Sequence, residues 1–299
     1  MKGFKHFLSY HSKGMPPKFM DELVKELAGR GLAESSIETY IRNLRTLNGS
    51  CDFKTFGFLH RPKVIEERLK PLASATQKTM LGTIVSVLKP YKDKVYYRRC
   101  YAYYKERLDQ MWKDGKERDT GEKTEKQNAN WVSWEDVLKT RERLRSEGKH
   151  LELMLLSLYT EIPPRRNKDF FEMVVSEGDN PDKTHNYCVM EKGRPVKLVF
   201  HLYKTRKEYG TQDIPIPDPL ADAILLTNPR VGEKLLPFQH ENGITRTLNR
   251  IFDKKIGASM LRHIYLSSKY GDRRDEMATD ARLMGHSIQQ QQTTYTQRH

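Results

Sequence analysis

The sequence predicts a mainly α-helical fold with one small antiparallel β-sheet, an α+β fold divided into two domains. Apolar residues recur at helical spacing through the first third of the chain, and β-rich runs are confined to residues 170–217. A charged stretch without large apolar residues separates two apolar regions. The length of 299 residues is sufficient for two domains that each bury a core.

The first domain, residues 1–113, is expected to be all-helical because four apolar stripes follow the helical period. Ser35 and Glu38 have the spacing of a capping box, which would open the second helix. Pro90 ends the third helix because proline lacks the backbone donor that a helix interior needs. The stripes are Phe19, Leu23, Val24 and Leu27; Ile37, Tyr40, Ile41, Leu44 and Leu47; Met80, Leu81, Ile84, Val85 and Leu88; and Tyr97, Tyr101, Tyr104, Leu108 and Met111.

Residues 114–130 (DGKERDTGEKTEKQNAN) are expected to form a charged linker. They include no apolar residue larger than Ala129, so they cannot bury enough surface to become part of a core. The second domain, residues 131–299, is expected to combine helices with the sheet. Its expected elements are helices over 134–144 and 151–159, strands in MVVSE, YCVME, KLVFHLY and QDIPIP, and helices after Asp218 that include one over about 258–270 and a short one before Gly285.

The formal net charge of +14, from 53 Lys and Arg residues against 39 Asp and Glu residues, favours polyanionic partners. Nucleic acid is the first candidate, and an anionic membrane surface is the second. The longest apolar run, residues 151–159, is far too short to span a membrane, and the first ten residues lack the apolar region of a signal peptide. We therefore expect a soluble intracellular protein.

The three cysteines, Cys51, Cys100 and Cys188, are far apart and form no Cys-x-x-Cys pair. Neither a disulfide framework nor a zinc site is indicated, and we expect reduced thiols.

An Arg, Lys, Arg, His, Tyr series runs through the second domain in chain order. Its first arginine follows a Pro-Pro pair that ends a buried helix, and its lysine lies at the end of an apolar strand. The second arginine lies in a predicted helix, and the histidine follows a glycine nine residues before the tyrosine. Such groups can bind a phosphodiester and replace one of its ester bonds. The residues are Arg166, with Arg165 as an alternative; Lys204, with Lys207 as an alternative; Arg262; His286; and Tyr295.

This series resembles the tyrosine recombinase (phage-type integrase) family over the whole second domain. The most specific part is LMGHSIQQQQTTYTQ, where a Gly-His-Ser segment precedes the tyrosine at the family spacing, with Leu261-Arg262-His263 on the preceding helix. The segment 166–169 resembles the family's Gly-x-Arg-x-x-Glu setting, with Pro for Gly and Asp for Glu. Lys204-Thr205 resembles the hairpin lysine. The Pro-Arg cluster and the hairpin are most similar to recombinases of large DNA viruses and virophages.

The resemblance implies a site-specific recombinase or integrase that cuts and rejoins duplex DNA through a 3′-phosphotyrosine on Tyr295, without a metal ion or other cofactor. Arg166 and Arg262 would bind the non-bridging oxygens, Lys204 would protonate the leaving 5′ oxygen, and His286 would donate a hydrogen bond in the transition state. The first domain would be a core-binding-like DNA-binding domain, and recombination would use four protomers on synapsed DNA. The protein would act at DNA, in a host nucleus or viral replication site during viral genome integration, or otherwise in a nucleoid.

One departure concerns Ser259, three residues before Arg262, where the family has histidine. Serine cannot act as an imidazole acid or base, so the proton of Tyr295 would need another acceptor, such as His263 or water. Only four residues follow Tyr295, so we expect that the helix with which many family members dock onto a neighbouring protomer is absent or has been removed.

Two alternatives remain from the residues alone. A type IB topoisomerase shares the phosphotyrosine chemistry but relaxes supercoils as a monomer, and a catalytically silent DNA-binding protein would explain Ser259. In the first domain, Arg98, Arg99 and Lys105 flank the tyrosine stripe and are candidates for DNA phosphate contacts, with a solvated helix face as the alternative.

Overall fold

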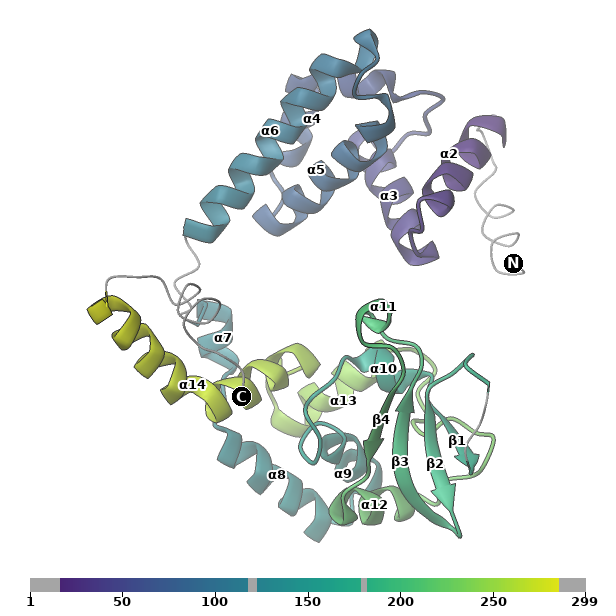
Figure 1. The fold of residues 1–299 in the computed structure, drawn as a ribbon, viewed down its shortest axis with the longest axis vertical. Helices are drawn as coiled ribbons and strands as arrows, with labels where there is room; N and C mark the ends of the chain where they lie inside the picture. Colours follow the sequence, from purple (N-terminus) through teal and green to yellow (C-terminus); the bar gives the residue numbers. More distant parts are fainter. Residues whose placement is uncertain (1–16, 118–122, 179–181, 285–299) are drawn as a thin grey trace. The chain divides into compact units, whose positions relative to one another are not determined.

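The computed structural model describes residues 17–117, 123–178 and 182–284, and His286 and Tyr295 lie outside these described residues. The chain divides into two compact units, Met1–Glu122 and Lys123–His299, and the division falls within the segment predicted as a linker (Figure 1). The mainly α-helical fold with a small sheet is confirmed.

The first unit is a helical unit around one apolar core, and all four predicted stripes contribute to that core. Tyr104 is fully buried, and its hydroxyl donates a hydrogen bond to the Leu59 carbonyl oxygen at 2.9 Å, so this tyrosine is a core residue. The described elements are α2 (Pro17–Gly29), α3 (Glu34–Leu47), the 3-10 helix η1 (Phe56–His60), α4 (Pro62–Leu69), α5 (Ser74–Leu88), the 3-10 helix η2 (Lys89–Tyr91) and α6 (Val95–Glu117).

The predicted capping box of α3 is wrong. The N-cap residue is Ala33, whose carbonyl oxygen accepts hydrogen bonds from the backbone N–H groups of Ser36 and Ile37, and its side chain makes no cap. Ser35 therefore lies inside the first turn. Glu34 adds a negative charge at this end, which suits the helix dipole.

Part of the predicted linker is helical. Its first residues complete α6, and Glu125–Asn130 form α7, which opens with a capping box between Thr124 and Gln127. No residue of α7 is buried, as expected for a segment without apolar side chains. The spacing of Thr124 and Gln127 predicts a helix start from the sequence without any buried apolar residue.

The second unit contains a four-stranded sheet in the order β1-β2-β3-β4 (Figure 1). The β2–β3 and β3–β4 pairs are antiparallel, but β1 and β2 are parallel, so the sheet is mixed rather than antiparallel. Parallel neighbours usually need a connection of a dozen or more residues, so the short segment 178–186 is unusual between two parallel strands. The strands are β1 (Val174–Glu177), β2 (Tyr187–Glu191), β3 (Arg194–Phe200) and β4 (Gln212–Pro215).

Helices and the sheet share the main core of this unit, in which α12 packs against both α9 and β3. The two helices predicted before Gly285 are a single helix, because one internal glycine costs only about 1 kcal/mol relative to alanine and good helix formers follow it. The helices are α8 (Trp134–Ser146), α9 (His150–Ser157), α10 (Asn167–Phe171), α11 (Arg206–Tyr209), α12 (Asp218–Leu225), α13 (Asn242–Phe252) and α14 (Ala258–Met284).

All three cysteines are free, and two of them are buried. Burial raises the pKa of the Cys100 thiol to about 11 and that of the Cys188 thiol to about 12, so both stay protonated at neutral pH. Across the described helices, none offers a stretch long and apolar enough to cross a membrane.

Candidate functional site

Two neighbouring arginines lie between α9 and α10, where Pro163 and Pro164 precede them. Proline keeps this connection out of helical geometry, and Arg166 itself has extended backbone angles, φ −78° and ψ 151°, as the residue immediately before α10. The sequence predicted Arg166 as the first functional arginine and Arg165 as its alternative. Their surroundings differ sharply.

The Arg165 guanidinium contacts acidic, amide and aromatic side chains of the protein. Its Nε donates to the Asp169 carboxylate at 3.2 Å, and its Nη1 donates to the Gln212 side-chain oxygen on β4 at 2.8 Å. The guanidinium also lies 3.8 Å from the ring centre of Phe200 and 4.9 Å from that of Tyr203. Arg165 therefore links α10, through the buried Asp169 carboxylate, to the sheet, through Gln212.

Arg166 has none of these contacts. Its side chain is half-buried, and its guanidinium makes no hydrogen bond or ion pair with any residue in the described parts of the chain. No described residue therefore occupies its donors. Since Arg165 already serves the fold, Arg166 is the better candidate for binding an anionic group at this position.

A chain of hydrogen bonds beside Arg166 joins α10 and α13 to the turn that follows α9. The buried hydroxyl of Tyr159 donates to Asn167 Oδ1 at 2.7 Å, and Asn167 Nδ2 donates to Thr245 Oγ1 on α13 at 2.8 Å. Asn167 directly follows Arg166 in the chain. The residue after Arg166 is thus held by polar contacts from Tyr159 and from α13.

Arg262 approaches the same hydrogen-bonded chain from α14. Burial raises the pKa of Tyr159, the negative charge of Asp169 raises it further, and the positive charge of Arg262 lowers it. Arg262 therefore lies close enough for its charge to act on the Tyr159 hydroxyl. Only its Nε makes a contact among the described residues, a long one of 3.5 Å to the Ala258 carbonyl oxygen, so its terminal nitrogens are available. Arg262 is thus near Tyr159, whose hydrogen-bond partner Asn167 directly follows Arg166.

Ser259 and His263 are both exposed near the start of α14. Because α14 begins at Ala258, Ser259 lies inside its first turn. It is three residues before Arg262, a spacing that places both side chains on the same side of the helix. A hydroxyl therefore lies beside Arg262 at the position where the resembled family has histidine.

The predicted hairpin lysine lies in the connection 201–211 between β3 and β4. Lys204 precedes the short helix α11, and Lys207 lies within it. Both side chains are exposed and without hydrogen-bonding or ionic partners in the described ranges. The choice between them stays open on these contacts.

A buried amide, Asn186, attaches this connection to α10. Its Nδ2 donates to the Asp169 carbonyl oxygen at 2.8 Å and to the Leu202 carbonyl oxygen at 3.0 Å. Its Oδ1 accepts from the backbone N–H groups of His201 at 2.8 Å and Leu202 at 2.7 Å. The loop that carries Lys204 is thereby bonded to the helix that follows Arg166. Sequence reasoning missed Asn186 because its partners are backbone atoms in other segments, which leave no local pattern.

We expect the Asp169→Ala variant to lose about 3 kcal/mol of unfolding free energy, near the lower end for a buried ion pair because Arg165 is partly exposed. Urea unfolding followed by circular dichroism measures this loss. The matched control is Asp218→Ala, which breaks a surface pair with Arg194 and should cost less than about 1 kcal/mol. Equal losses in the two variants would contradict the structural role of Asp169.

In the first unit, the three predicted DNA-binding residues lie on α6. Arg98 and Arg99 are exposed and without hydrogen-bonding or ionic partners among the residues described. Lys105 is half-buried and forms an ion pair with Asp109, which offsets its charge. Arg98 and Lys105 are seven residues apart and so face the same side of the helix. Of the three, the two arginines offer uncompensated positive charge.

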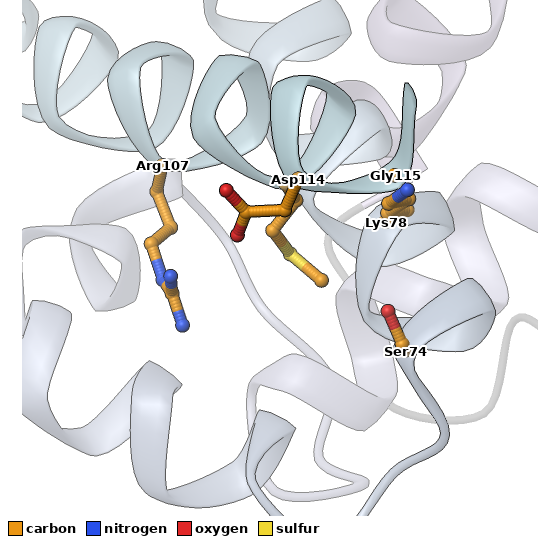
Figure 2. A pocket seen from close by; sticks show the side chains of 6 residues that line it. Ser74, Lys78, Arg107, Asp114 and Gly115 are labelled. Carbon is orange, nitrogen blue, oxygen red and sulfur yellow. The ribbon is translucent and has the colours of Figure 1, made fainter. Parts of the chain in front are cut away.

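Two hollows in the first unit were not anticipated. One lies between the start of α5 and the end of α6, and Figure 2 shows its wall. Arg107 in this pocket pairs with Glu66 at 3.5 Å, and the Asp114 carboxylate shares the wall, so acidic groups oppose an anionic ligand here. The pocket is lined by Ser74, Lys78, Arg107, Met111, Asp114 and Gly115, and a shallower hollow between α3 and α5 by Thr39, Arg42, Asn43, Thr46, Ala75, Thr76, Thr79 and Met80.

Within the described parts of the chain, His, Cys, Asp and Glu side chains form no group of three or more that could hold a metal ion. The chain has no match among protein-family models, curated proteins or solved structures.

Proposed function

We propose that this chain cleaves and rejoins duplex DNA in the manner of a tyrosine recombinase, with Tyr295 as the nucleophile. The observation that carries the proposal is that Arg166 directly precedes Asn167 and that the charge of Arg262 acts on Tyr159, the hydrogen-bond partner of Asn167. Both arginines have guanidinium donors that bind no described residue. Two planar guanidinium groups suit the non-bridging oxygens of a phosphodiester, because each can donate paired hydrogen bonds. The net charge of +14 supports DNA as the partner.

In the proposed reaction, the Tyr295 oxygen attacks the phosphorus and the bond to the 5′ oxygen breaks. The product is a 3′-phosphotyrosine and a free 5′-hydroxyl, whose proton comes from Lys204 or, failing that, Lys207. Arg166, Arg262 and His286 stabilise the charge on the non-bridging oxygens. Attack by a 5′-hydroxyl reverses the step and conserves the ester, so rejoining needs no nucleotide cofactor.

The phenolic proton of Tyr295 needs an acceptor, and Ser259 is no substitute for an imidazole base. Water can reach this position because Ser259 and the neighbouring His263 are both exposed. We assign the proton to water or to His263. The family resemblance extends the proposal to four protomers on synapsed DNA and to integration of a viral genome.

The test traps the covalent intermediate without knowledge of the DNA site. The full chain is incubated with a library of random-sequence duplexes and denatured with detergent, and attached DNA is recovered and sequenced. A phosphotyrosine peptide mapped to Tyr295 and an enriched sequence are the expected results. Adducts that lead only to relaxation of plasmids carrying that sequence favour the topoisomerase. Binding with enrichment but no adduct favours a silent DNA-binding protein.

The salt dependence of DNA binding should identify the phosphate contacts of α6. Each Arg or Lys that neutralises a phosphate contributes about one to the slope of log affinity against log salt. The Arg98→Ala/Arg99→Ala variant should therefore lower this slope by about two, as measured by fluorescence anisotropy with a mixed-sequence 40-bp duplex. Lys105→Ala is the matched comparison and should lower it less, because Asp109 already compensates that charge. An unchanged slope in the double variant would remove α6 from the DNA-binding surface.

A further inference from the structure

The connection between β3 and β4 is a loop that a hydrogen bond between its two ends closes. The Tyr203 hydroxyl donates to the Gly210 carbonyl oxygen at 2.8 Å, and the Tyr203 ring lies against the Arg165 guanidinium. Gly210 has φ 69° and ψ −152°, a backbone conformation that only glycine adopts without strain. Asn186 also bonds His201 and Leu202, so hydrogen bonds hold the chain at both ends of residues 203–210.

This loop presents an aromatic ring among positive charges. The Tyr209 side chain is 59% exposed, and Lys204, Arg206 and Lys207 are exposed beside it along the chain. The one acidic residue of the loop, Glu208, is hydrogen-bonded to the Tyr209 hydroxyl, and this contact raises the pKa of Tyr209. The ring thus remains neutral, with its faces accessible. An exposed aromatic ring among positive charges is the combination with which proteins bind single-stranded nucleic acid.

We infer that Tyr209 stacks on a DNA base exposed next to the cleaved bond, while the neighbouring cations hold the adjacent phosphates. This inference rests on the proposed function, since strand cleavage interrupts the backbone and lets the base beside the 5′-hydroxyl leave the helical stack. Every base offers a π-face, so an aromatic side chain can bind it in any sequence context. The loop also carries Lys204, so the stacked base would lie beside the leaving 5′ oxygen.

The probe is a 40-bp mixed-sequence duplex with a three-nucleotide gap flanked by 5-iodouracil, compared with the intact duplex. Near-ultraviolet light links iodouracil to an aromatic ring stacked on it, and mass spectrometry locates the linked residue. We expect linkage at Tyr209 on the gapped DNA. Tyr209→Leu should bind this DNA about 10-fold more weakly than the wild type, whereas Tyr209→Phe should retain both linkage and affinity.

The matched control is Tyr270→Leu, which removes another exposed tyrosine, on α14, and should change neither result. Because Tyr209 is exposed, the thermal melting curves of its variants should coincide with that of the wild type. No linkage at Tyr209 when the gapped DNA is bound, or wild-type affinity in Tyr209→Leu, overturns the inference. Both assays are repeated with Tyr295→Phe, which cannot form the proposed adduct, so failure of the cleavage proposal and failure of base stacking are distinguished.

Discussion

The Tyr295→Phe variant is expected to form no covalent adduct with DNA while binding the same DNA with unchanged affinity. Phenylalanine removes only the hydroxyl oxygen, which is the atom that would attack phosphorus and carry the 3′-phosphate. Adduct yield is measured by denaturing gel electrophoresis with a nicked duplex built on the sequence recovered from the library. Binding is measured by anisotropy. The loss should be complete, because no other group in the proposed mechanism replaces the nucleophile.

Other tyrosines provide the controls for this result. Tyr209→Phe and Tyr270→Phe remove exposed hydroxyls and should leave the adduct intact. Tyr104 and Tyr159 are fully buried, and burial raises the pKa of both, so neither can present an ionised oxygen to DNA. An adduct that persists in Tyr295→Phe would place the nucleophile elsewhere and end the present assignment.

The helices could be predicted because core-facing residues repeat at the helical period. Ile37, Ile41 and Leu44 form one apolar stripe in the sequence, and all three are buried in α3. The strands were also found from β-rich runs, but the parallel pairing of β1 with β2 was not. Alternation along a strand says which side chains share a face and nothing about the direction of its neighbour. That direction depends on contacts across the sheet.

The site could be predicted only in part. The spacing to Asp169 favours Arg166 in the sequence, yet the Asp169 carboxylate binds Arg165, so the contacts do not support that reason for choosing Arg166. The proximity of Arg262 to Tyr159 joins segments far apart in the sequence and needs the fold to become visible. Asn186 gave no signal, because an isolated asparagine before a strand is common in turns.

Variants of the two neighbouring arginines should differ in which property they lose, the rate of adduct formation or the stability of the fold. Arg166→Ala is expected to slow adduct formation by about 100-fold or more, the usual effect of removing a donor to a transition-state oxyanion. Its thermal stability should match the wild type, because its guanidinium makes no contact with the described residues that the change would break. Arg166→Lys should restore little activity, since an ammonium group cannot donate the paired hydrogen bonds of a guanidinium.

Arg165→Ala should show the opposite pattern. It leaves the Asp169 carboxylate buried without its partner and removes the stacking on Phe200, so the unfolding free energy should fall by about 3 kcal/mol. At low temperature, where the variant remains folded, single-turnover adduct formation should fall much less than in Arg166→Ala. A stable but inactive Arg165→Ala together with an active Arg166→Ala would exchange the two roles. The guanidinium with the most protein contacts would then be the catalytic one, and the availability of donors would be the wrong criterion for choosing between them.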